Sequence, residues 1–163
     1  MTTALAATWK PLGYVNESGV VLTPSMETNP VRAWQSATPV KYVVITAEYS
    51  LQFTLQQFDK ESVELYFGAS FVPAMDGATP PVAVPGVFRL DLDSTPELTE
   101  TALIVEWSDA TARNRLIVPR ASVSGREGLT LVRNEPTALG VTLNALDQGG
   151  ILGYLLTNAA VGT

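Results

Sequence analysis

The chain has 163 residues, of which 46% are hydrophobic and only 16% are charged, with a formal net charge of −6 and a pI near 4.5. An acidic chain lacks the clustered Lys and Arg that phosphate contacts need, which argues against a nucleic-acid-binding protein. It contains no Cys and no His, which excludes disulfides, thiol nucleophiles, Cys-ligated zinc and the commonest general base. We expect one soluble domain, because no signal-peptide core and no run of about 20 apolar residues is present.

The N-terminal segment, residues 1–30, combines aromatic side chains with turn residues. Residues 16–19 (NESG) predict a turn that leads into a short strand at residues 20–22, and Pro24 and Pro30 predict a loop after it. Trp9 and Tyr14 either pack in the core or anchor this segment on a neighbouring subunit, since Trp and Tyr are enriched at interfaces.

Residues 31–56 predict a hairpin with one overlong strand. Residues 31–35 (VRAWQ) predict its first strand and residues 36–39 its turn. From residue 43 to residue 56 the odd positions are apolar, and from Thr46 onward the even positions are polar, which is typical of a half-buried strand. At roughly 3.3 Å per residue this stretch spans about 45 Å, more than the core of a small domain needs. Either the strand bends between two sheets or part of it reaches a neighbouring molecule.

The rest of the chain predicts one helix and a series of short strands. Asp59 is a good N-cap and Gly68 a good C-terminal stop for a helix at residues 59–67. Residues 69–86, with prolines at 73, 80, 81 and 85, predict an irregular loop. Within residues 87–147 we expect strands at 87–92, 102–107, 114–118, 129–133 and 141–146, with turns at Asp109 and at residues 125–128. The apolar tail, residues 148–163, is expected to pack on the core or on a neighbour. The whole pattern predicts an all-β sandwich or barrel with one short helix.

Candidate chemistry is sparse. Asp91 and Asp93 resemble the start of a calcium loop, but the third acid and the Gly of that pattern are missing. Ser122 and Ser124 have no His to activate them. We therefore expect neither an enzyme, nor a cofactor, nor a metal site.

The chain resembles the major tail proteins of long-tailed, siphovirus-type bacteriophages, most strongly those of phages infecting actinobacteria. The similarity covers residues 9–147 and rests on an ordered set of short motifs. These are Trp9-x-x-Leu12-Gly13-Tyr14-Val15, Gly19-Val20, VRAWQ at 31–35, ELYFG at 64–68 and LIVPRA at 116–121.

This resemblance implies a β-sandwich that forms hexameric rings stacked into a tail tube, with an extended hairpin from each subunit joining a shared barrel. Phage DNA would pass through the lumen without specific binding. The implied partners are further copies of the chain and other tail proteins such as the tape measure and the terminator. The implied location is the virion, after assembly in the host cytoplasm. From the alternation we expect the polar side of the long strand to face the lumen, the alternative being that it is the solvent side of an ordinary sandwich. We also expect three aromatic residues to contact neighbouring subunits. The lumen set is Thr46, Glu48, Ser50, Gln52 and Thr54, and the contact set is Trp9, Tyr14 and Trp34.

Two alternatives stay open from the sequence. The first is a β-sandwich binding module, such as a capsid decoration or carbohydrate-binding domain, for which Trp34 and Trp107 are the candidate aromatics. The second is a tube protein of a secretion apparatus related to phage tails.

Overall fold

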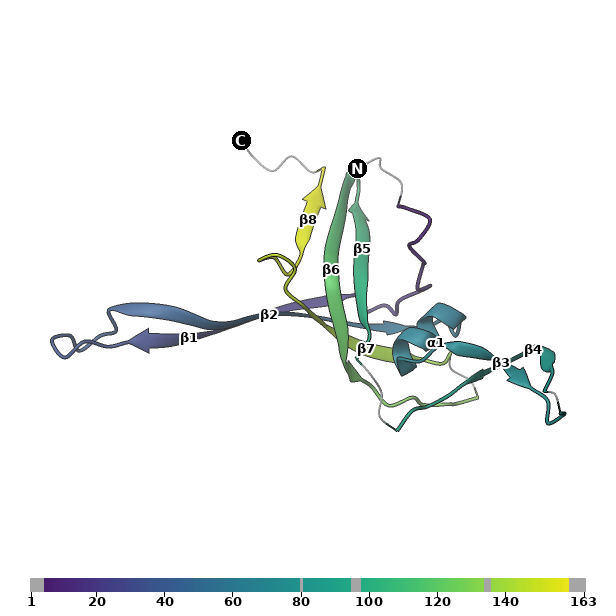
Figure 1. Ribbon diagram of the computed structural model, residues 1–163. Helices are drawn as coiled ribbons and strands as arrows, with labels where there is room; N and C mark the ends of the chain where they lie inside the picture. Colours follow the sequence, from purple (N-terminus) through teal and green to yellow (C-terminus); the bar gives the residue numbers. More distant parts are fainter. Residues whose placement is uncertain (1–4, 80, 95–97, 134–135, 159–163) are drawn as a thin grey trace.

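The computed structural model describes residues 5–79, 81–94, 98–133 and 136–158, which form a mostly antiparallel β-protein with one short helix (Figure 1). A six-stranded sheet has the order β1-β2-β7-β6-β5, with β8 paired to β6, and β3 and β4 form a separate two-stranded sheet. The elements are β1 (Val21–Val31), β2 (Lys41–Leu55), α1 (Lys60–Phe67), β3 (Phe71–Met75), β4 (Ala83–Leu90), β5 (Glu100–Asp109), β6 (Ala112–Arg126), β7 (Leu139–Ala145) and β8 (Tyr154–Thr157). The prediction of an all-β fold with one short helix is confirmed.

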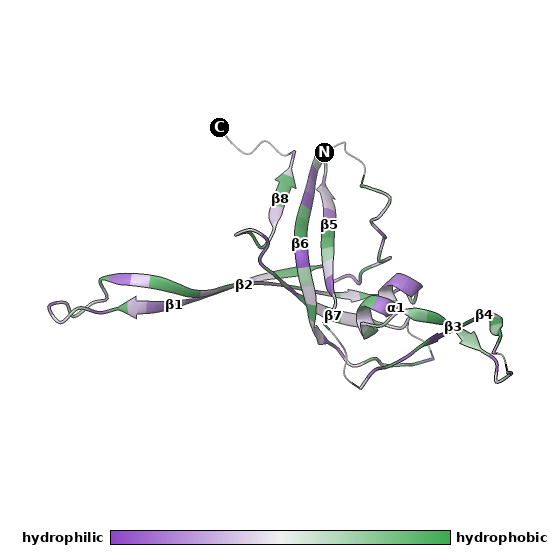
Figure 2. Ribbon diagram, in the orientation of Figure 1, coloured by the Kyte–Doolittle hydropathy of each residue, from purple (hydrophilic) through white to green (hydrophobic). Residues whose placement is uncertain are grey.

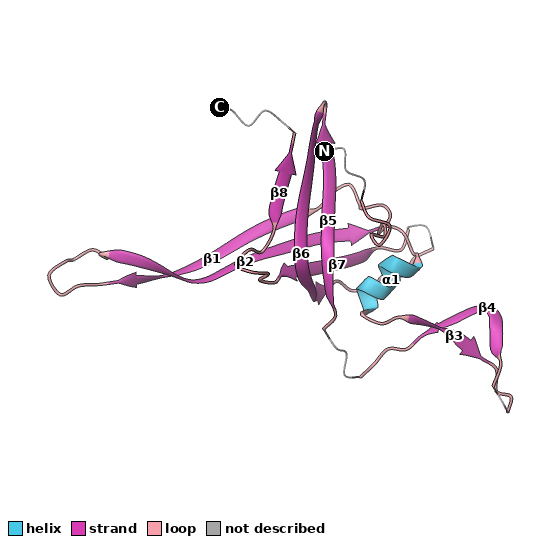
Figure 3. Ribbon diagram, turned by 45° about the horizontal axis from the view of Figure 1, so that its top comes forward, coloured by secondary structure: helices cyan, strands magenta, loops and turns pink. Residues whose placement is uncertain are grey.

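The larger sheet bends because β6 is shared between two groups of strands. It pairs with β5 over residues 112–122, with β8 over residues 114–117 and with β7 over residues 121–126. As a result β1, β2 and β7 run across the direction of β5, β6 and β8 (Figures 1 and 3). Helix α1 lies beside the end of the sheet where β2 finishes. None of the helices in the described part of the chain is both long and apolar enough to span a membrane.

The core follows directly from the alternation in β2. Its last three odd positions oppose three apolar residues of β7, and all six side chains are at most 4% exposed. These pairs are Leu51–Leu143, Phe53–Val141 and Leu55–Leu139. Val63 and Tyr66 of α1 belong to the same buried cluster, so the helix covers one face of the sheet as a half-buried strand requires.

Both ends of α1 are closed as the sequence predicts. The Asp59 carboxylate accepts a hydrogen bond from the Ser62 backbone N–H at 2.8 Å. Gly68 has φ of 70°, the left-handed conformation that glycine adopts without strain, and its N–H donates to the Glu64 carbonyl at 2.8 Å. The Ser62 hydroxyl in turn donates to the Leu12 carbonyl at 2.9 Å, which ties the N-terminal segment to the helix.

We expect Asp59→Ala to lower the free energy of unfolding by about 1 kcal/mol, because the first turn of α1 loses its side-chain acceptor. Urea unfolding followed by circular dichroism measures this change. Lys60→Ala is the control, since Lys60 lies next to the cap and makes only a long, exposed ion pair with Glu64. Equal midpoints for the two variants would contradict the capping role.

Three assignments from the sequence, two loops and one strand, are wrong around the prolines. The loop expected between Pro24 and Pro30 is part of β1, and residues 31–35 (VRAWQ) are not a strand: only Val31 ends β1, and residues 32–40 connect β1 to β2. The hairpin therefore begins at Val21 rather than at residue 31. The loop expected at residues 69–86 contains β3 and the first half of β4, with residue 80 outside the described residues. The strands of these regions that contain prolines, β1, β3 and β4, each have an unpaired side, where a missing N–H costs no ladder bond.

Two further differences concern the second half of the chain. The strand expected at residues 129–133 is absent: these residues belong to the connection between β6 and β7, which pair directly with each other and leave no place for a strand between them. The turn expected at residues 125–128 begins later, since Gly125 and Arg126 still belong to β6. The apolar tail packs on its own chain through β8, while residues 159–163 of the predicted tail lie outside the described residues.

Candidate functional site

The feature that the core does not explain is a long two-stranded arm, residues 24–49. β2 pairs with β7 only over residues 50–55, so beyond Ser50 it is held by β1 alone. Every residue of β2 from Lys41 to Tyr49 is exposed. The arm projects far from the body of the molecule and ends in the connection of residues 32–40 (Figures 1 and 3). An isolated two-stranded ribbon is marginally stable in water, so we look to the arm for contacts beyond the chain.

The register of β1 and β2 gives the arm one polar and one apolar face, since directly opposed residues of an antiparallel pair share a face. The polar face of the arm consists of Ser25, Glu27, Asn29, Val31, Lys41, Val43, Thr46 and Glu48. The apolar face of the arm consists of Pro24, Met26, Thr28, Pro30, Tyr42, Val44, Ala47 and Tyr49.

A β-bulge at Ile45 keeps the apolar face continuous. Glu27 opposes Thr46 and Thr28 opposes Val44, which leaves Ile45 as the extra residue of β2. The bulge moves Val44 to the apolar face and Val43 to the polar face, the reverse of what simple alternation predicts. The sequence carried this signal: the even positions are polar only from Thr46 onward, so the alternation breaks where the bulge lies.

The apolar face of the arm has no cover within the described chain. It continues the side of β2 that is fully buried at Leu51, yet Met26 is 67% exposed and Tyr42 is 62% exposed. A contiguous exposed apolar strip of this kind marks a protein-interaction surface. The apolar side of β2 that is buried in the body therefore continues along the arm, where no other part of the described chain covers it.

The five residues predicted to face the lumen share one side of β2, but they occupy two environments. Thr46 and Glu48 lie on the free arm. Ser50, Gln52 and Thr54 lie where β7 continues the sheet, opposite Asn144, Thr142 and Gly140. There the polar side chains bond to one another: Gln52 Nε2 donates to Glu127 Oε1 and Ser124 Oγ to Asn144 Oδ1, both at 3.0 Å. The polar side of the sheet is thus continuous from the arm to β6.

Negative charge predominates on the polar face of the arm. Glu27 and Glu48 lie on adjacent strands within it, and its single basic residue, Lys41, lies at the far end. Farther along the same side of the sheet, the Arg120 guanidinium donates to both carboxylate oxygens of Glu100, at 2.7 and 3.0 Å. This hydrogen bonding lowers the pKa of Glu100 and raises the pKa of Arg120, so the cation there is already paired.

The structure does not bring the three predicted contact aromatics together. Trp34 is 99% exposed in the connection at the end of the arm. Tyr14 is also exposed, but it lies at the other end of β2, where its carbonyl accepts from the Gln56 N–H at 2.9 Å. Trp9 is half-buried against the body. Trp107, the second candidate for a carbohydrate site, lies on β5 and shares no sheet face with Trp34.

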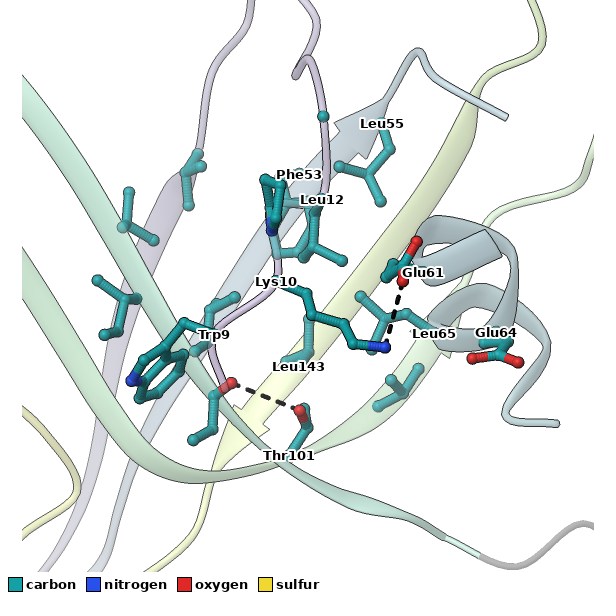
Figure 4. A pocket seen from close by; sticks show the side chains of 18 of the residues that line it. Trp9, Lys10, Leu12, Phe53, Leu55, Glu61, Glu64, Leu65, Thr101 and Leu143 are labelled. Carbon is teal, nitrogen blue, oxygen red and sulfur yellow. Dashed lines mark hydrogen bonds and ion pairs between the residues drawn. The ribbon is translucent and has the colours of Figure 1, made fainter. Parts of the chain in front are cut away.

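A cavity of about 1570 Å³ lies between the N-terminal segment, β2, β5 and α1 (Figure 4). The lining residues labelled in Figure 4 are mainly apolar. The charged residues among them are paired within the chain: Lys10 Nζ lies 3.2 Å from Glu61 Oε1, and the Glu64 carboxylate accepts a hydrogen bond from the Phe71 N–H at 2.7 Å. Asp91, whose sequence context only resembles the start of a calcium loop, pairs with Arg89. Among the described residues no group of three or more His, Cys, Asp or Glu could hold a metal ion. The arm, rather than the cavity, is the candidate functional surface.

Comparison with known proteins gives one finding. A family model described as phage tail tube protein matches residues 1–157, which include the arm, α1 and all strands of the described structure. A search of the curated proteins gave no match.

Proposed function

The chain belongs to the phage tail tube protein family, and from this premise we propose that it forms hexameric rings which stack into the tube of a siphovirus-type tail. As a member of this family it is a structural virion protein that assembles with copies of itself and with other tail proteins. The proposal adds that the tube conducts DNA without binding it specifically, that the tape measure and the terminator are partners, and that assembly takes place in the cytoplasm of an actinobacterial host. The host and the tail type rest on the motif resemblance described above.

The observation that carries the proposal is the two-faced arm. Each arm has two free backbone edges, one on β1 and one on β2 beyond its pairing with β7. Unpaired strand edges promote uncontrolled association unless something covers them, and closure into a barrel removes them. Arms from neighbouring subunits placed side by side would form such a barrel, in which every arm has one face toward the lumen and one toward protein.

We assign the polar face of the arm to the lumen, together with Ser50, Gln52 and Thr54. The apolar face must be covered by protein because its large side chains are exposed in the single chain. The polar face carries carboxylates and hydroxyl groups, which stay hydrated at a water-filled channel. Like charge opposes adhesion of the DNA phosphates and lets the genome slide. Six chains of net charge −6 give a ring of −36, which acts in the same direction.

Glu48→Lys tests the lumen assignment. We expect tubes to form normally and DNA release to slow severalfold or stall, because each ring gains a circle of cations that attract phosphate. The measurement is the time course of DNA release from phage particles that carry the variant. Glu17→Lys is the matched control, since it makes the same charge change at an exposed turn in the N-terminal segment.

If Glu48→Lys forms intact tubes and releases DNA as fast as Glu17→Lys does, the polar face of the arm does not line the lumen.

The tube itself is tested by negative-stain electron microscopy and light scattering of the concentrated protein. Hollow tubes or six-fold rings are expected. A stable trimer without tubes would favour the decoration module instead.

A further inference from the structure

We propose that the hairpin formed by β3 and β4 is a second assembly arm, and that it covers the apolar face of the arm of the next copy of the chain. The inference rests on the proposed function, since it needs a tube made of identical subunits. The inference goes beyond the proposed function by naming the segment that contacts the arm.

The β3–β4 hairpin repeats the construction of the arm. At its base Phe71 opposes Leu90, and both side chains pack against the core. Beyond the base, strand alternation in β3 keeps Phe71, Pro73 and Met75 on one face. The partners in register extend this face on β4: Phe88 opposes Pro73, and Ala83 opposes Met75 beyond an irregularity in the register that places the extra residues on β4.

This core-facing side of the hairpin is uncovered where it leaves the body. Phe88 is 64% exposed and Met75 is 58% exposed. Figure 2 shows hydrophobic residues along β3 and β4 with few hydrophilic ones. A two-stranded hairpin with an exposed apolar face is only marginally stable on its own, which indicates that another protein surface covers this face.

The two apolar elements project from opposite sides of the molecule. Figures 1 and 3 both show the arm extending to one side of the sheet and the β3–β4 hairpin to the other, beyond α1. Within one chain the far parts of these elements cannot meet. Between two copies in the same orientation they can, and such a head-to-tail contact repeats from copy to copy until it closes a ring or continues as a filament.

The surfaces also match chemically. The apolar face of the arm contains no charged residue, and neither does the face of the hairpin that bears Pro73, Met75, Ala83 and Phe88. The charges of the hairpin are directed elsewhere. Arg89 opposes Val72 on the other face and pairs with Asp91, while the Asp76 carboxylate accepts from the Val82 N–H at 2.8 Å within the turn. Two sheet faces of this kind pack as in a β-sandwich.

Cysteine cross-linking tests the contact cleanly, because the chain contains no Cys. One preparation carries Ala83→Cys on the hairpin, and a second, affinity-tagged preparation carries Ala47→Cys on the apolar face of the arm. The tagged control carries Thr46→Cys, which lies on the adjacent position of β2 but on the polar face of the arm. Equal mixtures are assembled from dissociated subunits, oxidised and separated without reductant, and the same samples are viewed by electron microscopy.

We expect the tagged heterodimer to form at least severalfold more with Ala47→Cys than with Thr46→Cys. Equal yields, a preference for Thr46→Cys, or no heterodimer overturns the contact, whether or not tubes are seen. Tubes without the preferred cross-link leave the tail-tube assignment intact and remove only this contact. The preferred cross-link in samples that form only closed dimers or trimers supports the contact and contradicts the tube.

Discussion

Leu143→Ala is expected to lower the free energy of unfolding by about 2–5 kcal/mol, the range observed when a fully buried leucine is truncated. Leu143 is 0% exposed and lies on β7, the strand that joins the two halves of the bent sheet. It opposes Leu51 of β2 on one side and Val123 of β6 on the other. Removing its side chain leaves a cavity between both pairs, and a sheet held together through one central strand cannot close that cavity by a local shift.

Leu131→Ala is the matched control, since Leu131 is 74% exposed and lies outside the strands. Its change in unfolding free energy should stay within about 0.5 kcal/mol. Urea unfolding is followed by circular dichroism at concentrations where light scattering shows single chains. A similar loss of unfolding free energy in both variants would mean that the core does not lie between β2 and β7.

The parts of the fold that the sequence predicts well are those governed by neighbouring residues. Asp59 and Gly68 define α1 because capping involves residues within one helical turn. The apolar alternation in β2 identifies the strand and its buried side. The turn at Asp109 is also correct: Asp109 opposes Ala112 at the end of the β5–β6 hairpin, with Ala110 in the left-handed region at φ of 50°.

The errors arise where the three-dimensional position of a strand overrides local preference. Pro24 and Pro30 predict a loop, yet β1 tolerates them because it is the edge strand, and edge position depends on the order of strands in the sheet. Pro73 and Pro85 are tolerated in the same way in a hairpin with two free sides. The apolar run at residues 129–133 has the composition of a strand, but it connects β6 and β7, which already pair with each other.

For the candidate surface, the sequence identified one strand but not its neighbours. Thr46, Glu48, Ser50, Gln52 and Thr54 share a side of β2 as alternation requires, and their role at a lumen stays a prediction. The sequence did not predict that Met26 and Pro24 belong to this surface, because the prolines of β1 indicated a loop. Prolines likewise indicated a loop where the β3–β4 hairpin lies, so its apolar side was not predicted either. The contacts predicted for Trp9, Tyr14 and Trp34 depend on neighbouring subunits and likewise stay predictions.

Exchanging two adjacent residues of the arm, as Ala47→Glu with Glu48→Ala, is expected to abolish tube assembly. The exchange preserves composition, net charge and strand length, and it only moves one carboxylate from the polar face of the arm to the apolar face. Both positions are exposed in the single chain, so the free energy of unfolding should change by no more than about 0.5 kcal/mol. In an assembled tube the moved carboxylate would be buried without a partner, at a cost of several kcal/mol per subunit.

The single variant Glu48→Ala is the control, and it should still form tubes, because it removes a charge from the face assigned to the lumen without adding one to the interface. Assembly is measured by sedimentation of the concentrated protein and by electron microscopy of the pellet, with circular dichroism to confirm that each chain is folded. Tubes from the exchange variant at the normal concentration would show that the apolar face of the arm is not buried between subunits. Loss of tubes in Glu48→Ala alone would instead assign the subunit contact to the polar face. Because the two variants differ only at residue 47, a difference between them is attributable to the carboxylate placed on the apolar face of the arm.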